Sequence, residues 1–311
     1  MARQSSLPVA LRTMLHRLIQ PFGEGGAGIL TTLLVGVCIA GALFYSWSKW
    51  GPLVAQNSRY WITAESIDLN NLPDWISPET QIKKEVFSSG LLEEVSTLDP
   101  HAATRIAQAF ELNPWVKNVE RVTKSAPNRV RIELEYRQPI AVVWIQLTAN
   151  SGGWEPVDSE GVVLPEDRFH QEPERLNNYL RIVSQPPPQV PNDVGITWPD
   201  DRVQHGATLA TMLVRLWREW GIDNIYVARS VVDASPVFSL RAGQNVKIIW
   251  GRGPGLEQSG ELKAAQKLLL ISEYLKQHGA ISSWPASQIL DVQHPGGMRV
   301  TSRPSNRDLD R

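Results

Sequence analysis

Cysteine and excess charge are both nearly missing from this chain of 311 residues. The single cysteine, Cys38, lies within an apolar stretch, so this sequence contains no pair of cysteines that could form a disulfide. The 31 lysine and arginine residues are balanced by 32 aspartate and glutamate residues, and the formal net charge is −1. With no basic surplus or charge run, the sequence predicts no nucleic-acid partner, and without disulfides its fold depends on hydrophobic burial.

The short motifs of common catalytic chemistries are also absent. Neither G-x-S-x-G nor H-E-x-x-H occurs, and the 6 histidines are isolated in the sequence and have no cysteine partner. Gly251–Gly255 (GRGPG) lacks the lysine and the spacing of a phosphate-binding loop, and it indicates a turn. Asp200 and Asp201 could form a carboxylate pair, but adjacent carboxylates point apart more often than together. We therefore predict no enzymatic activity, no metal site and no cofactor.

One long window, Gly25–Ser48, contains no charged residue. Within it, Ala27–Trp47 is apolar and long enough to cross a hydrocarbon core of about 30 Å as a helix. Arg3, Arg12 and Arg17 precede it, and the positive-inside rule then places the N-terminus in the cytoplasm and the bulk of the chain outside it. We predict a cytoplasmic arm over residues 1–26 and a transmembrane helix over residues 27–47.

Two other interpretations of this window stay open. A cleaved signal peptide is one, because Ala40 and Ala42 form an A-x-A-like pair, although the apolar run exceeds the usual h-region of roughly 7–15 residues. A buried core helix is the other. In the arm itself, residues 7–19 indicate either a short helix on the membrane surface or a disordered basic segment.

Residues 60–137 predict a small α+β domain. Proline after a capping residue marks two helix starts, and valine-rich alternation marks two late strands. The expected elements, in chain order, are a strand at Tyr60–Asn70, a helix from Ser77-Pro78 to Gly90, a helix from Asp99-Pro100 to Asn113-Pro114, and strands at Val116–Lys124 and Val130–Tyr136. The Ser125–Asn128 turn makes the last two strands a predicted hairpin.

Residues 138–300 predict a second, mostly antiparallel β domain with flanking helices. Arg137 and Pro139 mark the seam between the two domains, because proline cannot donate to a strand ladder. The proline-rich stretch Phe169–Asp201 indicates an extended connector. The remaining expected elements are strands at Ile140–Leu147, Ile222–Val232, Val237–Leu240 and Val246–Trp250, helices at Ala207–Trp220 and Glu257–His278, and a last strand pair at Leu290–Val300.

Four stretches in this order resemble one family. They are Pro114-Trp115-Val116 with Val119, Val122 and Pro127; Arg137-Gln138-Pro139-Ile140-Ala141; Trp154–Leu164 (WEPVDSEGVVL); and Leu290–Val300 (LDVQHPGGMRV). Behind an N-terminal anchor, they resemble the FtsQ/DivIB family of bacterial cell-division proteins. The resemblance implies an α+β chain with one transmembrane helix, a POTRA-like βααββ domain at residues 60–137 and an FtsQ-type β domain at residues 138–300. The polar composition of residues 301–311 predicts a disordered tail.

The resemblance also implies a function. The protein would be a single-pass scaffold of the cell inner membrane at the division septum, binding small coiled-coil proteins like FtsB and FtsL and helping to control septal peptidoglycan synthesis. Other divisome proteins would bind the POTRA-like domain. The partner would add a strand to the last edge of the sheet, at Leu290, Asp291, Val292, Gln293, His294, Gly296, Gly297, Met298, Arg299 and Val300.

Gln293 and His294 stand where the family often has an arginine and a tyrosine, and Pro295 removes one backbone donor from this stretch. An ordinary edge hairpin without a partner is therefore an alternative interpretation of it. At the level of function, the alternatives are a membrane-anchored periplasmic chaperone or secretion component that uses its POTRA domain, and an anchored cell-wall hydrolase.

Overall fold

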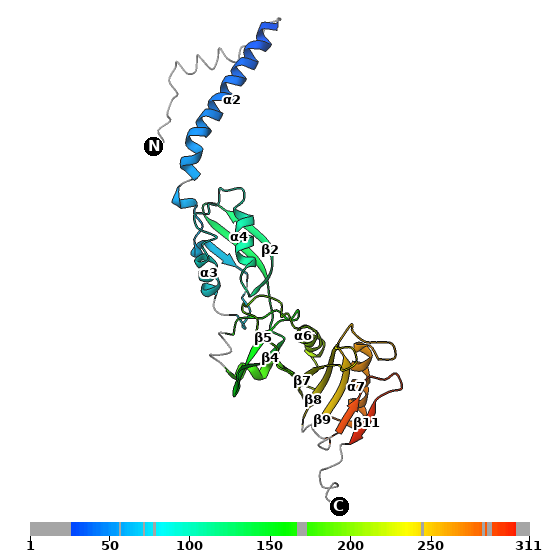
Figure 1. Cartoon of the computed structure of the whole chain (residues 1–311). Helices are drawn as coiled ribbons and strands as arrows, with labels where there is room; N and C mark the ends of the chain where they lie inside the picture. Colours follow the sequence, from blue (N-terminus) through cyan, green and yellow to red (C-terminus); the bar gives the residue numbers. More distant parts are fainter. Residues whose placement is uncertain are drawn as a thin grey trace, which may run out of the picture. The chain divides into compact units, whose positions relative to one another are not determined.

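The structure, a computed structural model, describes residues 26–55, 57–70, 72–76, 79–166, 173–243, 246–281, 284 and 288–302. It divides into two compact parts, Met1–Trp61 and Ile62–Arg311, and both predicted extramembrane domains fall mainly in the second. The predictions for the N-terminal arm, for the helix start at Ser77-Pro78 and for most of the C-terminal tail lie outside the described residues. The described chain is a mixed α and β fold (Figure 1).

The first part contains one long helix, α2 (Gly26–Ala55). Its segment Thr31–Gly51 is long and apolar enough to cross a membrane, and none of that segment is buried inside the protein. This disfavours the core-helix interpretation and fits a single-pass membrane protein. The segment lies about one helical turn later than the predicted span Ala27–Trp47.

A three-stranded sheet begins the second part, in the order β1-β3-β2. Strand β1 (Ile67–Leu69) pairs in parallel with β3 (Arg129–Tyr136), and β3 pairs antiparallel with β2 (Val116–Ser125), so the predicted hairpin is confirmed. Helices α3 (Glu79–Ser88) and α4 (Ala102–Glu111) accompany this sheet (Figure 1). The strand predicted at Tyr60–Asn70 is shorter than expected, because one 3-10 helix, Ser58–Tyr60, ends at its first residue and a second, Ala64–Ser66, directly precedes β1.

The alternation of β3 explains how this small sheet obtains its core. Val130, Ile132 and Leu134 are buried, and the residues between them are exposed or half-buried. They share a hydrophobic cluster with Ile106 and Phe110 of α4. One face of the sheet is therefore covered by helix and the other stays polar.

Eight strands form the larger sheet, in the order β11-β10-β9-β8-β7-β6-β4-β5. The pairs β4–β6, β6–β7 and β9–β10 are parallel and the other neighbours are antiparallel, so the sheet is mixed. The meander predicted from residue 222 onward is confirmed as β7, β8 and β9. The bounds are β4 (Ala141–Thr148), β5 (Ser151–Val157), β6 (Leu180–Ser184), β7 (Ile222–Arg229), β8 (Pro236–Ala242), β9 (Val246–Arg252), β10 (Gln288–Asp291) and β11 (Arg299–Ser302).

Strand β6 corrects the prediction of an extended connector at Phe169–Asp201. It lies in the interior of the sheet, between β4 and β7, and Leu180, Ile182 and Ser184 are buried on it. A short 3-10 helix, Pro173–Asn178, precedes it. The strand was missed because its few residues stand among prolines, whose density indicates a connector and outweighs such a short apolar signal.

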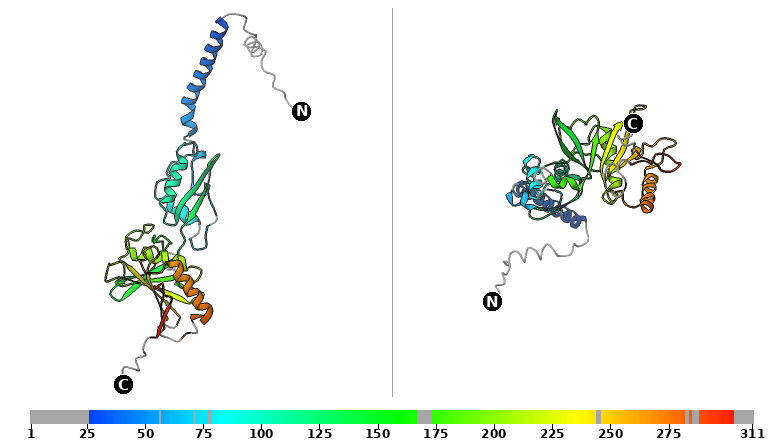
Figure 2. Two further views of the ribbon diagram at one scale, coloured as in Figure 1. Left: turned by 90° about the vertical axis from the view of Figure 1, so that its right-hand side faces the viewer. Right: turned by 90° about the horizontal axis from the view of Figure 1, so that it is seen from below.

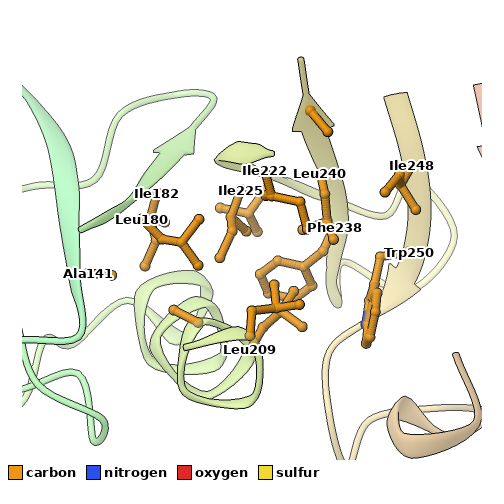
Figure 3. Packing of buried hydrophobic residues seen from close by; sticks show 14 of the residues in the cluster. Ala141, Leu180, Ile182, Leu209, Ile222, Ile225, Phe238, Leu240, Ile248 and Trp250 are labelled. Atoms are coloured by element: carbon orange, nitrogen blue, oxygen red, sulfur yellow. The ribbon is translucent and has the colours of Figure 1, made fainter. Parts of the chain in front are cut away.

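Helices α6 (Asp201–Leu213) and α7 (Ala264–His278) contribute to the core of the larger sheet (Figure 2). Leu209 of α6 points toward Ile225 and Phe238 of the sheet (Figure 3). Both predicted helix starts were wrong. Helix α6 begins earlier than Ala207, because Asp200 caps its first turn by accepting from the backbone N–H of Arg202. It also ends before the predicted Trp220, at Leu213.

The predicted start of the last helix at Glu257 was wrong for a related reason. Glu257 accepts from the backbone N–H groups of Gly255 and Ala264, which holds residues 257–263 as a loop before α7. The predicted end is confirmed, because Gly279 adopts a positive φ of 79° directly after His278.

Asp200 also predicts an acid dependence of stability. Burial alone raises the pKa of this carboxyl, but hydrogen bonds from Arg202 outweigh it and hold the pKa below its ordinary value. A depressed carboxyl pKa gives stability that is complete above the unfolded value of about 3.9 and is lost as the pH falls toward the folded value. We expect Asp200→Asn to lower the free energy of unfolding at pH 7 by about 1 to 2 kcal/mol.

The measurement is urea unfolding of the full chain in detergent micelles at pH 7 and near pH 3, with Asp201→Asn as the matched variant. The difference in free energy of unfolding between wild type and Asp200→Asn should shrink at the lower pH, because the wild-type carboxylate takes up a proton there. A difference that stays constant across this range would show that the cap acts without its charge.

Candidate functional site

The candidate binding edge is strand β11, which ends the order of the larger sheet. It pairs with β10 on one side through the registers Leu290↔Val300 and Asp291↔Arg299. Within the described residues no strand pairs with its other side. A terminal strand of this kind offers a row of backbone N–H and C=O groups to an incoming chain.

The structure divides the predicted site residues into three groups. Leu290 and Asp291 belong to β10, which is an interior strand, and Val292, Gln293, His294, Gly296, Gly297 and Met298 connect the two strands. Only Arg299 and Val300 lie on the terminal strand itself, where Thr301 and Ser302 continue it. Leu290 and Val292 are fully buried in the core. The last strand pair predicted at Leu290–Val300 is thus confirmed as β10 and β11, but only Arg299 and Val300 of the predicted site residues lie on the terminal strand.

Backbone hydrogen bonds hold the β10–β11 connection in place. Leu262 donates its N–H to the carbonyl of Gln293 at 2.8 Å, and Val292 donates to Ile249 at 3.2 Å. The N–H of Gln293 donates to Asp291 Oδ1 at 3.0 Å. Gln293 thus joins the hairpin to the loop before α7, and this is a structural role that the sequence did not indicate.

A buried ion pair lies beside this connection. Lys267 is fully buried, and its Nζ lies 2.7 Å from Glu261 Oε1 and 3.4 Å from the carbonyl oxygen of Arg252. The same Nζ lies 5.3 Å from the ring centroid of Trp250. Burial lowers the pKa of Lys267, while its hydrogen bond to Glu261 opposes that shift. Glu261 also accepts from the backbone N–H of Arg252, so one carboxylate joins the end of β9 to α7.

The sequence did contain a signal for this ion pair. Lys267 stands three residues after Ala264 and four before Ile271, both of which are buried on α7. A lysine on the apolar stripe of a helix requires a buried partner, and the nearby glutamates were candidates. By itself this signal is weak, because lysine most often stays exposed.

The predicted seam residue Arg137 forms a second buried ion pair. Its Nη1 lies 2.6 Å from Asp158 Oδ2, and the two side chains are 15% and 3% exposed. The carbonyl of Arg137 accepts from Trp75 Nε1 at 3.0 Å, and its N–H donates to the carbonyl of Trp115 at 2.9 Å. Arg137 therefore contacts residues on both sides of the predicted seam. The pair of Arg137 with Asp158 is therefore not a weak surface ion pair.

Pro139, the other seam residue, is buried between the end of β3 and the start of β4. Asp158, which pairs with Arg137, also accepts from the N–H groups of Glu160 and Val162 through Oδ1. The same carboxylate thus shapes the turn after β5 and neutralises Arg137. The Val157-Asp158 and Gly161-Val162 pattern noted in the sequence corresponds to this turn.

The carboxylates considered for catalysis are engaged in ion pairs. Arg202 Nη2 lies 2.6 Å from Asp200 Oδ2, and Arg229 Nη2 lies 2.6 Å from Asp201 Oδ1. Across the described ranges, no group of three His, Cys, Asp or Glu side chains could hold a metal ion. The arrangement of the site is suited to binding another chain through β11.

Comparison with known proteins finds no protein-family model that matches this chain and no curated protein that is significantly similar to it. A functional proposal therefore rests on the motif order of the sequence and on the geometry of β11.

Proposed function

We propose that this protein is a single-pass scaffold of bacterial cell division, similar to the FtsQ/DivIB family. It binds small coiled-coil proteins like FtsB and FtsL and helps to control septal peptidoglycan synthesis. Its N-terminus lies in the cytoplasm, and its folded part lies outside the inner membrane at the septum. The protein performs no enzymatic reaction and uses no cofactor.

The observation that carries the proposal is the position of β11 at the end of an eight-stranded sheet, in a chain whose described residues include one candidate membrane helix. A partner segment that extends this sheet gains main-chain hydrogen bonds without needing a preformed pocket. Arg299 and Thr301 are exposed on β11, and Val300 is 41% exposed, so both faces of the added strand would meet side chains. Gln293 and His294 lie outside this strand, so recognition depends chiefly on the backbone.

The small sheet supports the finer part of the proposal. Its elements follow the order strand, helix, helix, strand, strand expected of a POTRA-like domain at residues 60–137. We propose that this domain binds further divisome proteins.

The chaperone alternative has one observation in its favour. Strand β2, with 10 residues, ends the order of the small sheet and could receive a client strand in the same manner. Under that alternative, changes in β2 would abolish binding and changes in β11 would not.

Adjacent residues of β11 provide the test. In an antiparallel pair, one residue directs its N–H and C=O toward the neighbouring strand and the next directs them away. Val300→Pro and Thr301→Pro therefore each remove one backbone N–H donor. In one variant the lost donor points away from the sheet, and in the other it points toward β10. We expect one of the two variants to keep the wild-type unfolding curve and to lose capture of FtsB-like and FtsL-like proteins from its own cells.

The measurement is affinity purification of the full chain with identification of bound proteins by mass spectrometry, combined with septal localisation of a fluorescent fusion. Asn118→Pro, on β2 of the small sheet, is the matched control and should keep the captured coiled-coil proteins. If both β11 variants capture them as well as wild type does, strand addition at β11 is wrong. If only the β2 variant loses its partners, the chaperone alternative replaces the scaffold.

A further inference from the structure

The larger sheet has a groove on the face that its core does not use. This open-face groove has a volume of about 980 Å³ and crosses strands β6 to β10. Leu240 and Ile248 turn their side chains into the hydrophobic cluster with α6 and α7, and their neighbours Ser239 and Ile249 line the groove. Successive side chains of a strand point to opposite faces, so the groove lies opposite the helices.

The floor of the open-face groove is apolar. Its apolar side chains are partly exposed, because no described element covers them. They are Val183, Tyr226, Val237, Ile249 and Ile289. The strand register places three of them in one row across the sheet, since Val183 pairs with Tyr226, and Ser239 pairs with both Tyr226 and Ile249. An open sheet face of a protein is ordinarily polar, so a floor made mostly of apolar side chains indicates a binding surface.

The charge of the groove has one sign. Arg241 and Lys247 are paired in register across β8 and β9, and both line the groove. None of the described lining residues is aspartate or glutamate. Asp223, which lies 3.3 Å from Arg241, stands outside the lining. Gln185, Gln288 and Gln293 complete the rim with amide groups that can donate or accept. The surface is thus complementary to a ligand with aliphatic groups and carboxylates.

The dimensions favour a polypeptide. Five strands spaced about 4.8 Å apart give a trough about 19 Å across, which suits a chain segment. The tail of this chain is a poor occupant on charge, because residues 303–311 hold Arg303, Arg307 and Arg311 against only Asp308 and Asp310.

We propose that the open-face groove binds a segment of a partner protein in which aliphatic and acidic side chains alternate. The aliphatic side chains would pack on the floor, and the carboxylates would meet Arg241 and Lys247. This inference does not rest on the proposed function, because it uses the side chains of β6 to β10 and not the backbone of β11.

The test uses the full chain in lipid nanodiscs and two labelled peptides of equal length, one alternating leucine with glutamate and the other alternating leucine with lysine. Fluorescence anisotropy should show binding of the acidic peptide and not of the basic one. Lys247→Glu should weaken that binding about tenfold or more, and Arg241→Gln should weaken it as well, because each removes a complementary charge. Lys276→Glu, an exposed change of the same charge on α7, should leave it unchanged.

Equal binding of both peptides, or unchanged binding by Lys247→Glu, would overturn the proposal. A tenfold gain in affinity for the acidic peptide on deleting residues 303–311 would show that the tail of the chain is the occupant. If the chain forms concentration-dependent dimers and Lys247→Glu abolishes them, a second copy of this chain is the occupant. The proline variant of β11 that keeps the wild-type unfolding curve should bind the acidic peptide normally, which separates this result from the outcome for strand addition.

Discussion

Replacing Arg137 with alanine is expected to lower the free energy of unfolding by about 3 to 5 kcal/mol. The guanidinium lies 2.6 Å from Asp158, whose side chain is only 3% exposed, so the change leaves a buried carboxylate without its counter-charge. An uncompensated buried charge costs far more than an exposed ion pair contributes, because the interior cannot solvate it. The measurement is urea unfolding of the full chain in detergent micelles, followed by tryptophan fluorescence.

Arg131→Ala is the matched control for Arg137→Ala. Arg131 lies 3.2 Å from Asp68, but the two side chains are 70% and 65% exposed, so we expect a loss of less than about 1 kcal/mol. Adding Asp158→Asn to Arg137→Ala should recover part of the lost stability, because the amide keeps an acceptor for Glu160 and Val162 without the charge. A loss for Arg137→Ala as small as that of the control would show that the pair is solvated.

Glu261→Gln is expected to lower the free energy of unfolding by about 3 kcal/mol or more, because it leaves the fully buried Lys267 charged and without its counter-charge. Lys267→Met combined with Glu261→Gln should return close to wild-type stability, since methionine fills a similar volume and needs no counter-charge. The same unfolding measurement applies. Arg121→Met is the matched control, because Arg121 Nε lies 3.6 Å from Glu133 Oε2 and the two side chains are 71% and 43% exposed, and its change should lower the free energy of unfolding by less than about 1 kcal/mol.

The pH dependence gives an independent test of the same pair. Burial lowers the pKa of Lys267 in the folded chain, so between the folded value and the unfolded value of about 10.4 the unfolded chain binds more protons. The free energy of unfolding should therefore rise with pH in that alkaline window for wild type. The double variant should lack this rise. An identical alkaline slope in both proteins would contradict the assignment of Lys267 as the titrating group.

Local patterns predicted the elements of the small sheet well. The alternation in β3 needs only its own residues, because Val130, Ile132 and Leu134 all face one core. The helix ends near Gly90 and Gly279 also follow from local geometry, since both glycines adopt a positive φ. The turn between β2 and β3 was equally local.

Elements that depend on distant partners were predicted poorly. Strand β6 has few residues and is stabilised by β4 and β7, which are far away in the sequence, so its own composition could not reveal it. The parallel pairing of β10 with β9 likewise results from the passage of the chain through α7 between them. The missed start of α6 is different, because its signal was local: Asp200 caps the helix by accepting from the backbone N–H of Arg202, two residues later.

The candidate site shows the same division. The sequence indicated a strand pair near residues 290–300, but only the pairing of β10 with β9 determines that β11, and not β10, is terminal. The ion pairs of Lys267 and Arg137 each join residues brought together by packing. The open-face groove exists only because five strands align their outward side chains.

By itself, the sequence determined the charge-free apolar helix, the lack of common catalytic motifs and most of the regular elements, because these depend on the nature and spacing of neighbouring residues. The tertiary structure alone decided which strand ends the sheet, which charges are buried and where an apolar face remains open. Those properties depend on contacts between residues far apart in the chain, and strand order is not encoded in the periodicity of any single strand.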